Sequence, residues 1–440
     1  MQQVFPIKIS CAVLAAALAA CATAAPKQAA KPAAKQPAQP TVVELEFVQQ
    51  LGADKGEQLA KLVERFNEAN PNIKVTLSDR DWTEGKQPAL ILPTQEGEDR
   101  LISTKRYKPL WDVMRGAGLP LKTFPVLKMV TPTPVNSKGR LEALPVALST
   151  PVLFYNKDAL AKAGLDPNNV PKTWMDWQAA MGKIYASGNT CPFTTVQPAW
   201  ILIENTSAWN NQPFVSMNGK QEALAANGLI QVKHLAMMSS WYKARYLQVF
   251  GRGDEALEPF AKGACAVLTA PSDDYPTLQR MASFDIGVAP FPFHGDAYGA
   301  PQNTVADGSS LWIGAGKTAA EYKAAAKFVN FWLTPETQVE WQVNAGYLPL
   351  NTAGALATGS KLLSDKLLAQ QIAIEELTNK PVSIASTAST YGRRAGVRRI
   401  LDEEIESVWA NKKPAKQALD DAVNRARAGE DGCCRATVRP

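Results

Sequence analysis

The sequence predicts an α/β protein built as two lobes, and three observations carry this prediction. A strand, a helix and a second strand follow one another at residues 42–48, 55–70 and 73–77. Further capped helices alternate with short apolar strands along the rest of the chain. The length of 440 residues exceeds what one hydrophobic core usually serves. No repeat with a period of about 20 to 50 residues occurs, which excludes solenoids and propellers.

The first three elements follow from side-chain periodicity. Residues 42–48 alternate apolar and polar side chains, as a half-buried strand does. The apolar residues of 55–70 recur at spacings of three and four and line one helix face: Leu59, Leu62, Val63 and Phe66. Residues 73–77 alternate again after Asn70-Pro71 stops the helix. The βαβ order predicts that the sheet begins with parallel strands.

Capping residues mark the later helices. Thr173 begins a helix that ends near residue 187, and Thr318 with Glu321 forms a capping box for 319–333. Thr334-Pro335 then starts a helix that ends at Gly346. Further helices are expected at 402–409 and 415–428, and short strands at 151–155 and 264–269.

Composition excludes several classes of function. Hydrophobic residues make up 46% of the chain and charged residues 20%, so most of the chain is expected to fold. The net charge of +6 is dispersed, whereas a nucleic-acid-binding protein concentrates its basic residues. The two histidines, His234 and His294, are too few for a histidine-rich metal centre, and we expect both to serve packing or the surface.

The N-terminus has the features of an export signal. Lys8 precedes an apolar run at residues 11–20, so residues 1–25 are interpreted as a signal peptide. Leu18-Ala19-Ala20-Cys21 resembles a lipoprotein signal with lipid on Cys21; the alternative is ordinary cleavage near residues 22–24. The composition of 26–41 predicts a solvated tether. We therefore expect a periplasmic protein, tethered to the membrane if Cys21 carries the lipid.

Cysteine usage fits an oxidising compartment. Cys191 and Cys265 are isolated in the body of the chain and are predicted to form one disulfide; the alternative is two buried free thiols. Cys433 and Cys434 lie in the polar segment 429–440, which is predicted to be a disordered tail.

Catalytic motifs are absent, so we predict no catalytic residue, no cofactor and no metal site. Ser240 and Lys243 match a serine–lysine spacing, but the partner motifs are missing. Glu403 and Glu404 occupy adjacent helix positions and point in different directions. Eleven tryptophans and ten tyrosines suit stacking against sugars or polyols, although each of them is equally a candidate core residue.

Several long segments resemble one known family. Residues 324–351 (AAAKFVNFWLTPETQVEWQVNAGYLPLN) are similar to extracellular solute-binding proteins of ABC importers. Three further segments resemble, more narrowly, the periplasmic binding proteins for sn-glycerol-3-phosphate: 149–174, 299–312 (GAPQNTVADGSSLW) and 398–409 (RRILDEEIESVW). Residues 204–214 (ENTSAWNNQPF) do so as well. The likeness extends over residues 42–426.

The resemblance implies the periplasmic-binding-protein fold, with two lobes that are joined by hinge-crossing segments and close on a ligand. The first lobe is then expected to comprise 42–147 with 282–335, and the second 148–281 with 336–428. The implied partners are a small phosphorylated polyol and the permease subunits of an importer. We expect a monomer that binds no nucleic acid.

The resemblance also implies a set of ligand contacts. Arg398 is the strongest candidate, because a guanidinium holds a phosphate with two hydrogen bonds and keeps its charge. An ion pair with Asp402 or Glu403 is the alternative role. Further matching positions are Ser149, Tyr347 and Gly308, for which capping, packing or turn roles stay open. Trp200 would lie under the glycerol part of the ligand or in the core.

The first lobe departs from the family pattern. A helix expected after the second strand lacks about a dozen residues near Gly85. The family's contacts near this gap are a tyrosine and a glutamate. The matching positions here are Thr83, beside Trp82, and Gln95. Another falls on Pro271, beside Ser272. Loss of a carboxylate at the polyol end makes the identity of the ligand less certain than its class.

Four functions therefore remain as hypotheses. The first is a substrate-binding subunit for sn-glycerol-3-phosphate or a glycerophosphodiester. The second is a protein of the same fold that binds a neutral sugar or oligosaccharide. A secreted hydrolase and a remnant that no longer binds ligand are the others.

Overall fold

The computed structural model describes residues 42–119, 121, 135–136, 138–218, 221–350, 365–383 and 394–429. The signal peptide, Cys21, the tether and the Cys433-Cys434 tail lie outside these residues. No helix in the described ranges has both the length and the apolar composition that crossing a membrane requires.

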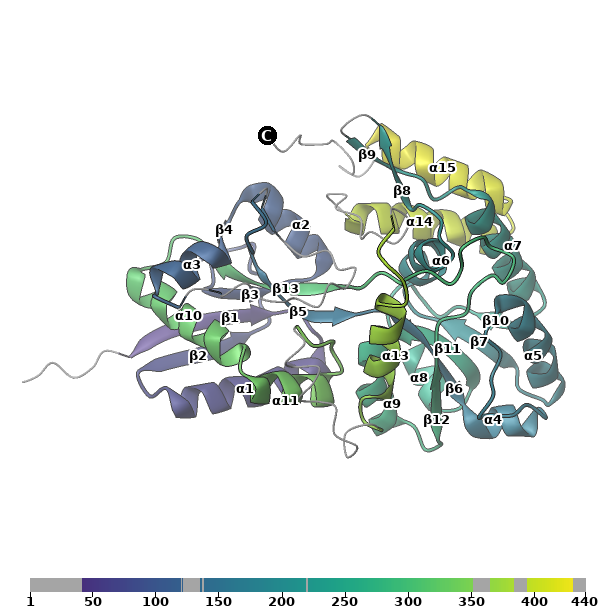
Figure 1. Cartoon of the computed structure of the whole chain (residues 1–440), viewed down its shortest axis with the longest axis horizontal. Helices are drawn as coiled ribbons and strands as arrows, with labels where there is room; N and C mark the ends of the chain where they lie inside the picture. Colours follow the sequence, from purple (N-terminus) through teal and green to yellow (C-terminus); the bar gives the residue numbers. More distant parts are fainter. Residues whose placement is uncertain are drawn as a thin grey trace, which may run out of the picture. The chain divides into compact units, whose positions relative to one another are not determined.

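Two separate sheets make the two lobes (Figure 1). In the first, β1 (Val43–Gln49) pairs in parallel with β2 and β3, which confirms the parallel start of the sheet. Strand β13 joins antiparallel to β3, β4 and β5. The other strands of this sheet are β2 (Ile73–Ser78), β3 (Leu90–Leu92), β4 (Tyr107–Lys108), β5 (Leu144–Ser149) and β13 (Asp307–Gly314).

The second sheet has the order β10-β7-β11-β6-β12. Its strands are β6 (Pro151–Asn156), β7 (Cys191–Thr195), β10 (Leu247–Gln248), β11 (Cys265–Pro271) and β12 (Ile286–Ala289). A separate hairpin consists of β8 (Val215–Asn218) and β9 (Gln221–Leu224). Strand β12 pairs with β6, so residues 286–289 belong to the second lobe and not to the first, where the sequence analysis placed them.

Helices cover both sheets. Those of the first lobe are α1 (Ala53–Ala69), α2 (Gln95–Thr104), α3 (Leu110–Gly116), α10 (Ala319–Trp332) and α11 (Pro335–Ala345). The sequence analysis assigned α11 to the second lobe. Its residues Trp341 and Ala345 instead pack into the first hydrophobic core, together with Phe66 of α1.

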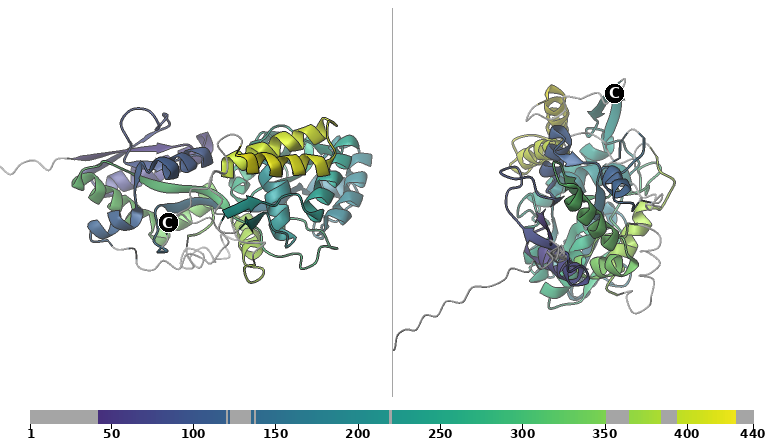
Figure 2. Two further views of the ribbon diagram at one scale, coloured as in Figure 1. Left: turned by 90° about the horizontal axis from the view of Figure 1, so that it is seen from above. Right: turned by 90° about the vertical axis from the view of Figure 1, so that its left-hand side faces the viewer.

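The second lobe contains most of the remaining helices. They are α4 (Lys157–Lys162), α5 (Trp174–Ala186), η1 (Ala199–Asn205), α6 (Thr206–Trp209), α7 (Leu229–Lys243), α8 (Leu257–Ala261), η2 (Ser272–Asp274), α9 (Tyr275–Met281) and α13 (Leu368–Leu377). The last two, α14 (Arg394–Trp409) and α15 (Ala415–Ala428), lie side by side in both views of Figure 2.

The predicted capping signals are present. Thr318 and Glu321 form the reciprocal capping box at α10, and Thr173 and Thr334 accept hydrogen bonds at the starts of α5 and α11. Residues 79–89 between β2 and β3 contain no helix, in agreement with the short segment seen in the sequence.

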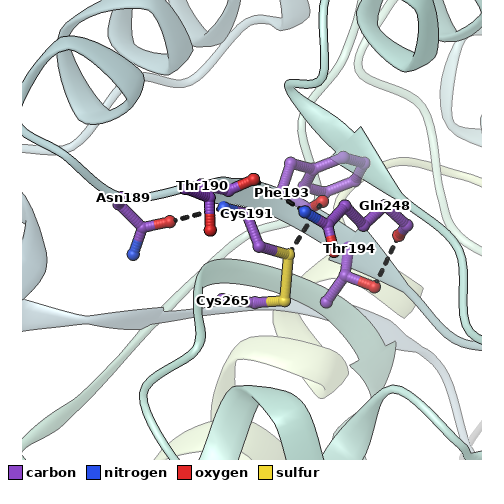
Figure 3. Close-up of a disulfide and its surroundings, with 7 residues drawn as sticks. All are labelled: Asn189, Thr190, Cys191, Phe193, Thr194, Gln248 and Cys265. Atoms are coloured by element: carbon purple, nitrogen blue, oxygen red, sulfur yellow. Dashed lines mark hydrogen bonds between the residues drawn. A yellow bond between two sulfur atoms is a disulfide. The ribbon is translucent and has the colours of Figure 1, made fainter.

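One disulfide joins two adjacent inner strands of the second sheet (Figure 3). Cys191 of β7 and Cys265 of β11 lie opposite each other in the parallel register, with 4.5 Å between their Cα atoms. The bond therefore links neighbouring strands that are 74 residues apart in sequence.

Candidate functional site

Arg398 is a buried cation between two carboxylates. Its Nε and Nη2 donate to Oε2 of Glu204 at 2.9 and 2.7 Å, and its Nη1 donates to Oδ2 of Asp307. Burial lowers the pKa of Arg398, but the two carboxylates raise it by more, so the net shift is upward. The guanidinium is therefore permanently charged and does not form the predicted alternative pair with Asp402 or Glu403.

Three elements bring this group together. Arg398 lies in the first turns of α14 and Glu204 near the end of η1, both in the second lobe. Asp307 is the first residue of β13 in the first sheet. Gln95 begins α2, and its Nε2 donates to Oδ2 of Asp307 at 2.6 Å. We call these four residues, Arg398, Glu204, Asp307 and Gln95, the arginine cluster.

Trp200 lies against the arginine cluster. The Cζ atom of Arg398 is 5.6 Å from the centroid of the Trp200 ring, within cation–π range. The indole is buried, and its Nε1 has no hydrogen-bond partner in the structure. A buried donor without a partner is costly, so a ligand that accepts this hydrogen bond would be stabilised here.

Asp402 connects α14 to the start of η1. One of its carboxylate oxygens accepts a hydrogen bond of 3.0 Å from the backbone N–H of Ala199, the residue before Trp200. Burial is the main cause that raises the pKa of Asp402 to about 7. The contact fixes the position of Trp200 relative to Arg398.

Strands β5 and β13 place two further candidates beside Asp307. Ser149 is its register partner, and Gly308 lies opposite Leu148. Gly308 has φ +148°, and a Cβ atom added there would be 1.6 Å from the carbonyl oxygen of Ala147. The close approach of the two strands therefore explains the glycine without any ligand.

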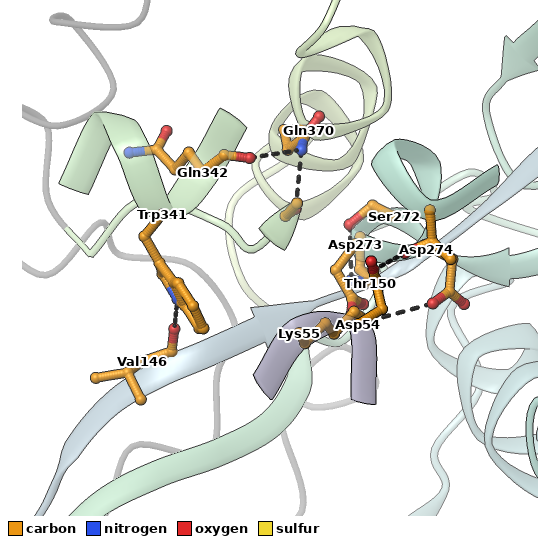
Figure 4. A network of polar contacts seen from close by, with 12 residues as sticks. Asp54, Lys55, Val146, Thr150, Ser272, Asp273, Asp274, Trp341, Gln342 and Gln370 are labelled. Carbon is orange, nitrogen blue, oxygen red and sulfur yellow. Dashed lines mark hydrogen bonds and ion pairs between the residues drawn. The ribbon is translucent and has the colours of Figure 1, made fainter. Parts of the chain in front are cut away.

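A second polar group surrounds Lys55 of α1 (Figure 4). Its Nζ forms ion pairs with Asp273 and Asp274 of η2, and it lies 5.0 Å from the ring centroid of Tyr347. Burial is the largest cause that raises the pKa values of Asp274, to about 7, and of Tyr347. Tyr347 also stacks on Trp341. We call Lys55, Asp273, Asp274 and Tyr347 the lysine cluster.

Ser272 precedes Asp273 of the lysine cluster and contacts Thr150, the residue that connects β5 to β6. Its backbone N–H donates to the carbonyl of Thr150, and its Oγ accepts from the Thr150 N–H at 3.5 Å. Leu348, after Tyr347, donates its N–H to the carbonyl of Leu148. These bonds hold Ser272 and Tyr347 near Ser149.

Two candidates of the first lobe, Trp82 and Thr83, make other contacts. Trp82 is buried in a small core with Ile91 and Trp312. Thr83 occupies the turn between β2 and β3, where its carbonyl accepts from Arg106 at 3.0 Å. Gln95, in contrast, donates a hydrogen bond to Asp307, which pairs with Arg398.

No cluster of three or more histidine, cysteine or acidic side chains suited to a metal ion occurs in the described residues. The two histidines are buried neighbours, with 3.1 Å between Nδ1 of His234 and Nε2 of His294. Burial is the main cause that lowers both pKa values, that of His294 to about 4. The pair serves the core of the second lobe.

The model of the bacterial extracellular solute-binding protein family matches residues 61–369. The chain belongs to this family. As a solute-binding protein, it is 35% identical over 401 residues to the sn-glycerol-3-phosphate-binding periplasmic protein UgpB of Salmonella typhimurium, covering 87% of this chain and 92% of that protein. The UgpB of Escherichia coli O1:K1 is 36% identical over the same shares.

Solved structures share the two-lobed fold of this solute-binding protein. UgpB of Mycobacterium tuberculosis in complex with glycerophosphocholine has a TM-score of 0.71 at 20% identity, covering 87% of this chain and 97% of that one. The GacH receptor of Streptomyces glaucescens, solved unliganded and with acarbose, has a TM-score of 0.70 at 16% identity, covering 88% and 98%.

The sequence analysis of this solute-binding protein did not identify the two carboxylates that pair with Arg398. Glu204 and Asp307 both lie inside segments that carry the family resemblance, yet nothing local marks them as partners of Arg398. Asp307 is 91 residues from Arg398 in sequence and Glu204 is 194. The adjacent acids Asp273 and Asp274 were a local signal, but their pairing with Lys55 depends on the approach of η2 to α1.

Proposed function

We propose that this protein is the extracytoplasmic substrate-binding subunit of an ABC importer and captures sn-glycerol-3-phosphate or a glycerophosphodiester for delivery to the permease. The observation that carries the proposal is the buried guanidinium of Arg398, which lies against the ring of Trp200. It also pairs with Asp307, the register partner of Ser149. Its fork matches a phosphate, and the indole offers an apolar face to a glycerol moiety. The names of the UgpB relatives agree with this ligand class.

The protein acts, on this proposal, as a monomeric periplasmic binding protein and not as an enzyme. Ser240, of the serine–lysine spacing, lies on α7 and donates its hydroxyl to the Met237 carbonyl. Attachment through a lipid on Cys21 remains part of the proposal. Delivery requires that the permease distinguish the loaded form of the binding protein from the empty form. The permease must therefore bind one of these two states more tightly than the other.

A neutral sugar is the second candidate ligand. Glu204 and Asp307 already neutralise Arg398, and carboxylates are strong acceptors for sugar hydroxyls. The solved maltose-binding relative from Thermotoga maritima has the same fold, with a TM-score of 0.69 at 17% identity.

Titration calorimetry distinguishes the candidates. We expect heat with sn-glycerol-3-phosphate or glycerophosphocholine and none with maltose, together with a ligand-dependent rise in melting temperature. Heat with maltose alone would establish the sugar. A protein that melts sharply but binds neither class would be the remnant, and release of inorganic phosphate would indicate the hydrolase.

Arg398→Lys tests the role of the arginine. Removing the side chain altogether would leave two buried carboxylates without their cation and destabilise the fold. Lysine keeps the charge but loses the planar fork, so we expect at least about tenfold weaker binding of phosphorylated glycerol. Arg252→Lys is the matched control, because Arg252 also makes a two-bond pair with a carboxylate, that of Glu406 of α14. Equal affinities in the two variants would contradict the assignment of Arg398.

A further inference from the structure

The second lobe contains a cavity of about 360 Å³ that is separate from the two polar clusters. Its lining comes from α7, from residues 249–252 after β10 and from α14. The α14 residues in the lining are Asp402, Ile405, Glu406 and Trp409, whose spacing of three and four places them on one face of the helix. No residue of the arginine cluster or the lysine cluster belongs to this lining. We call the cavity the α14 pocket.

Three aromatic side chains line the α14 pocket: Tyr242, Phe250 and Trp409. Tyr242 and Trp409 stack, with 5.6 Å between their ring centroids and 24° between the ring planes. Phe250 and Tyr242 are 41% and 40% exposed, so part of each ring is available to a ligand. The face of an aromatic ring carries partial negative charge and attracts cations.

The charged side chains of the lining are one guanidinium and two carboxylates. Glu406 accepts two hydrogen bonds from the guanidinium of Arg252, at 2.6 and 2.7 Å, and so balances its charge. Asp402 supplies the second carboxyl group, and the hydrogen bond that it accepts comes from the backbone N–H of Ala199. Once Asp402 is ionised, the charged residues of the lining carry one net negative charge. This charge favours a positively charged ligand over a neutral one.

We propose that the α14 pocket is a binding site for a small organic cation, whose quaternary ammonium group lies between the three aromatic rings and the carboxylate of Asp402. Aromatic faces combined with negative charge recognise quaternary ammonium groups, and the volume of the cavity is in the range of small-molecule sites. The site differs from the candidate ligand site at Arg398 and does not depend on the proposed function.

Titration calorimetry of the purified protein with two probes tests the proposal at constant ionic strength. The probes are choline and 3,3-dimethyl-1-butanol, which have nearly the same shape, although only choline carries a positive charge. At pH 8 we expect a dissociation constant for choline below about 1 mM. The alcohol should bind at least about tenfold more weakly, because it lacks the attraction to the rings and to the carboxylate.

Phe250→Ala tests whether choline binds in the α14 pocket. The substitution removes one exposed ring of the lining, and we expect choline to bind about five- to tenfold more weakly. Tyr298→Ala is the matched control, because Tyr298 is also an aromatic residue, is 92% exposed and does not line the pocket. The affinity for choline should be unchanged in this variant.

A pH series provides a second measurement. Burial is the main cause that raises the pKa of Asp402 to about 7, while Arg252 and Arg398 favour the ionised form and Glu406 opposes it. The remaining polar group of α7 in the lining is the phenol of Tyr242. Asp402 is neutral below this pKa and charged above it, so the affinity for choline should rise as the pH increases from about 5.5 to 8.5. In Asp402→Asn the affinity should be low and independent of pH, since asparagine can keep the hydrogen bond to the η1 backbone.

Several results would overturn the proposal. They are the absence of choline binding to the folded protein, equal affinities for choline and the alcohol, and an unchanged affinity in a folded Phe250→Ala protein. A wild-type affinity that does not depend on pH would count equally against it. If sn-glycerol-3-phosphate binds, its saturation should leave the affinity for choline unchanged, whereas competition would place choline at Arg398 and refute the separate site. A protein that binds choline but no phosphate ester would refute the proposed function alone.

Discussion

Gly308 shows how a single residue determines the geometry beside the candidate site. Its φ of +148° is unfavourable for residues with a side chain, and the Ala147 carbonyl occupies the space of a Cβ atom. The glycine thus lets β13 approach β5, which brings Asp307 opposite Ser149.

Gly308→Ala should therefore destabilise the protein strongly. The backbone strain and the clash with backbone atoms act together, and we expect a loss of about 3 kcal/mol or more in the free energy of unfolding. Gly316→Ala is the control, because Gly316 has φ +74° but open space around it. It should cost only the conformational penalty of about 1 to 2 kcal/mol. Urea denaturation of both variants measures the difference, and equal losses would contradict the steric argument.

The same scale limits what a sequence reveals about the site. Arg398 could be named as a candidate because it lies in a long segment with family resemblance and has a side chain suited to phosphate. Its partners could not, because a carboxylate acquires this role only when β13 and η1 bring it to α14. Trp82 illustrates the converse: its indole suits a ligand as well as a core, and in the structure it packs with Trp312 in a small core.

At the scale of elements, the disulfide between β7 and β11 is the main covalent constraint in the described residues. It closes a loop of 74 residues, and the chain-entropy relation gives about 4 kcal/mol of stabilisation for that length. Both strands lie in the middle of the second sheet, between β10 and β6. The bond therefore strengthens the lobe that carries Arg398.

Replacing both Cys191 and Cys265 by alanine should lower the free energy of unfolding by about that amount. Thermal melting measures it, with and without a thiol reductant. The reductant should lower the melting temperature of the wild-type protein and leave the variant unchanged. If the melting temperature of the wild-type protein did not change after full reduction, verified by thiol titration, the disulfide would have no stabilising role.

Helices with clear caps were predictable, whereas only the second half of α14 was predicted. The Thr318 and Thr334 signals gave the starts of α10 and α11 because a cap is a local interaction. Helix α14 begins at Arg394, whereas the sequence predicted a helix only from residue 402. Its first half is rich in arginine, and the residues that bury it, Val397, Ile400 and Leu401, pack against other parts of the second lobe.

At the scale of the whole molecule, the two-lobed α/β fold was predictable, but the membership of some elements was not. Strand β12 and helix α11 each belong to the lobe opposite to the one predicted. Neither segment contains a local feature that indicates which lobe it joins, because strand order depends on contacts between residues far apart in sequence. The chain passes between the lobes at Thr150, and both polar clusters join residues of the two lobes near such passages.

The two clusters give the lobes a direct electrostatic connection. Asp307 of the first lobe meets Arg398 of the second, and Lys55 of the first meets Asp273 and Asp274 of the second. A ligand bound between these groups contacts both lobes, which is what closure on a ligand requires.

A crystal structure of the protein with sn-glycerol-3-phosphate or its methyl phosphodiester tests the central claim most directly. We predict a phosphate oxygen within hydrogen-bonding distance of the Arg398 guanidinium, and the glycerol carbons against the indole of Trp200. A phosphate bound elsewhere, with Arg398 still held by Glu204 and Asp307, would contradict the account.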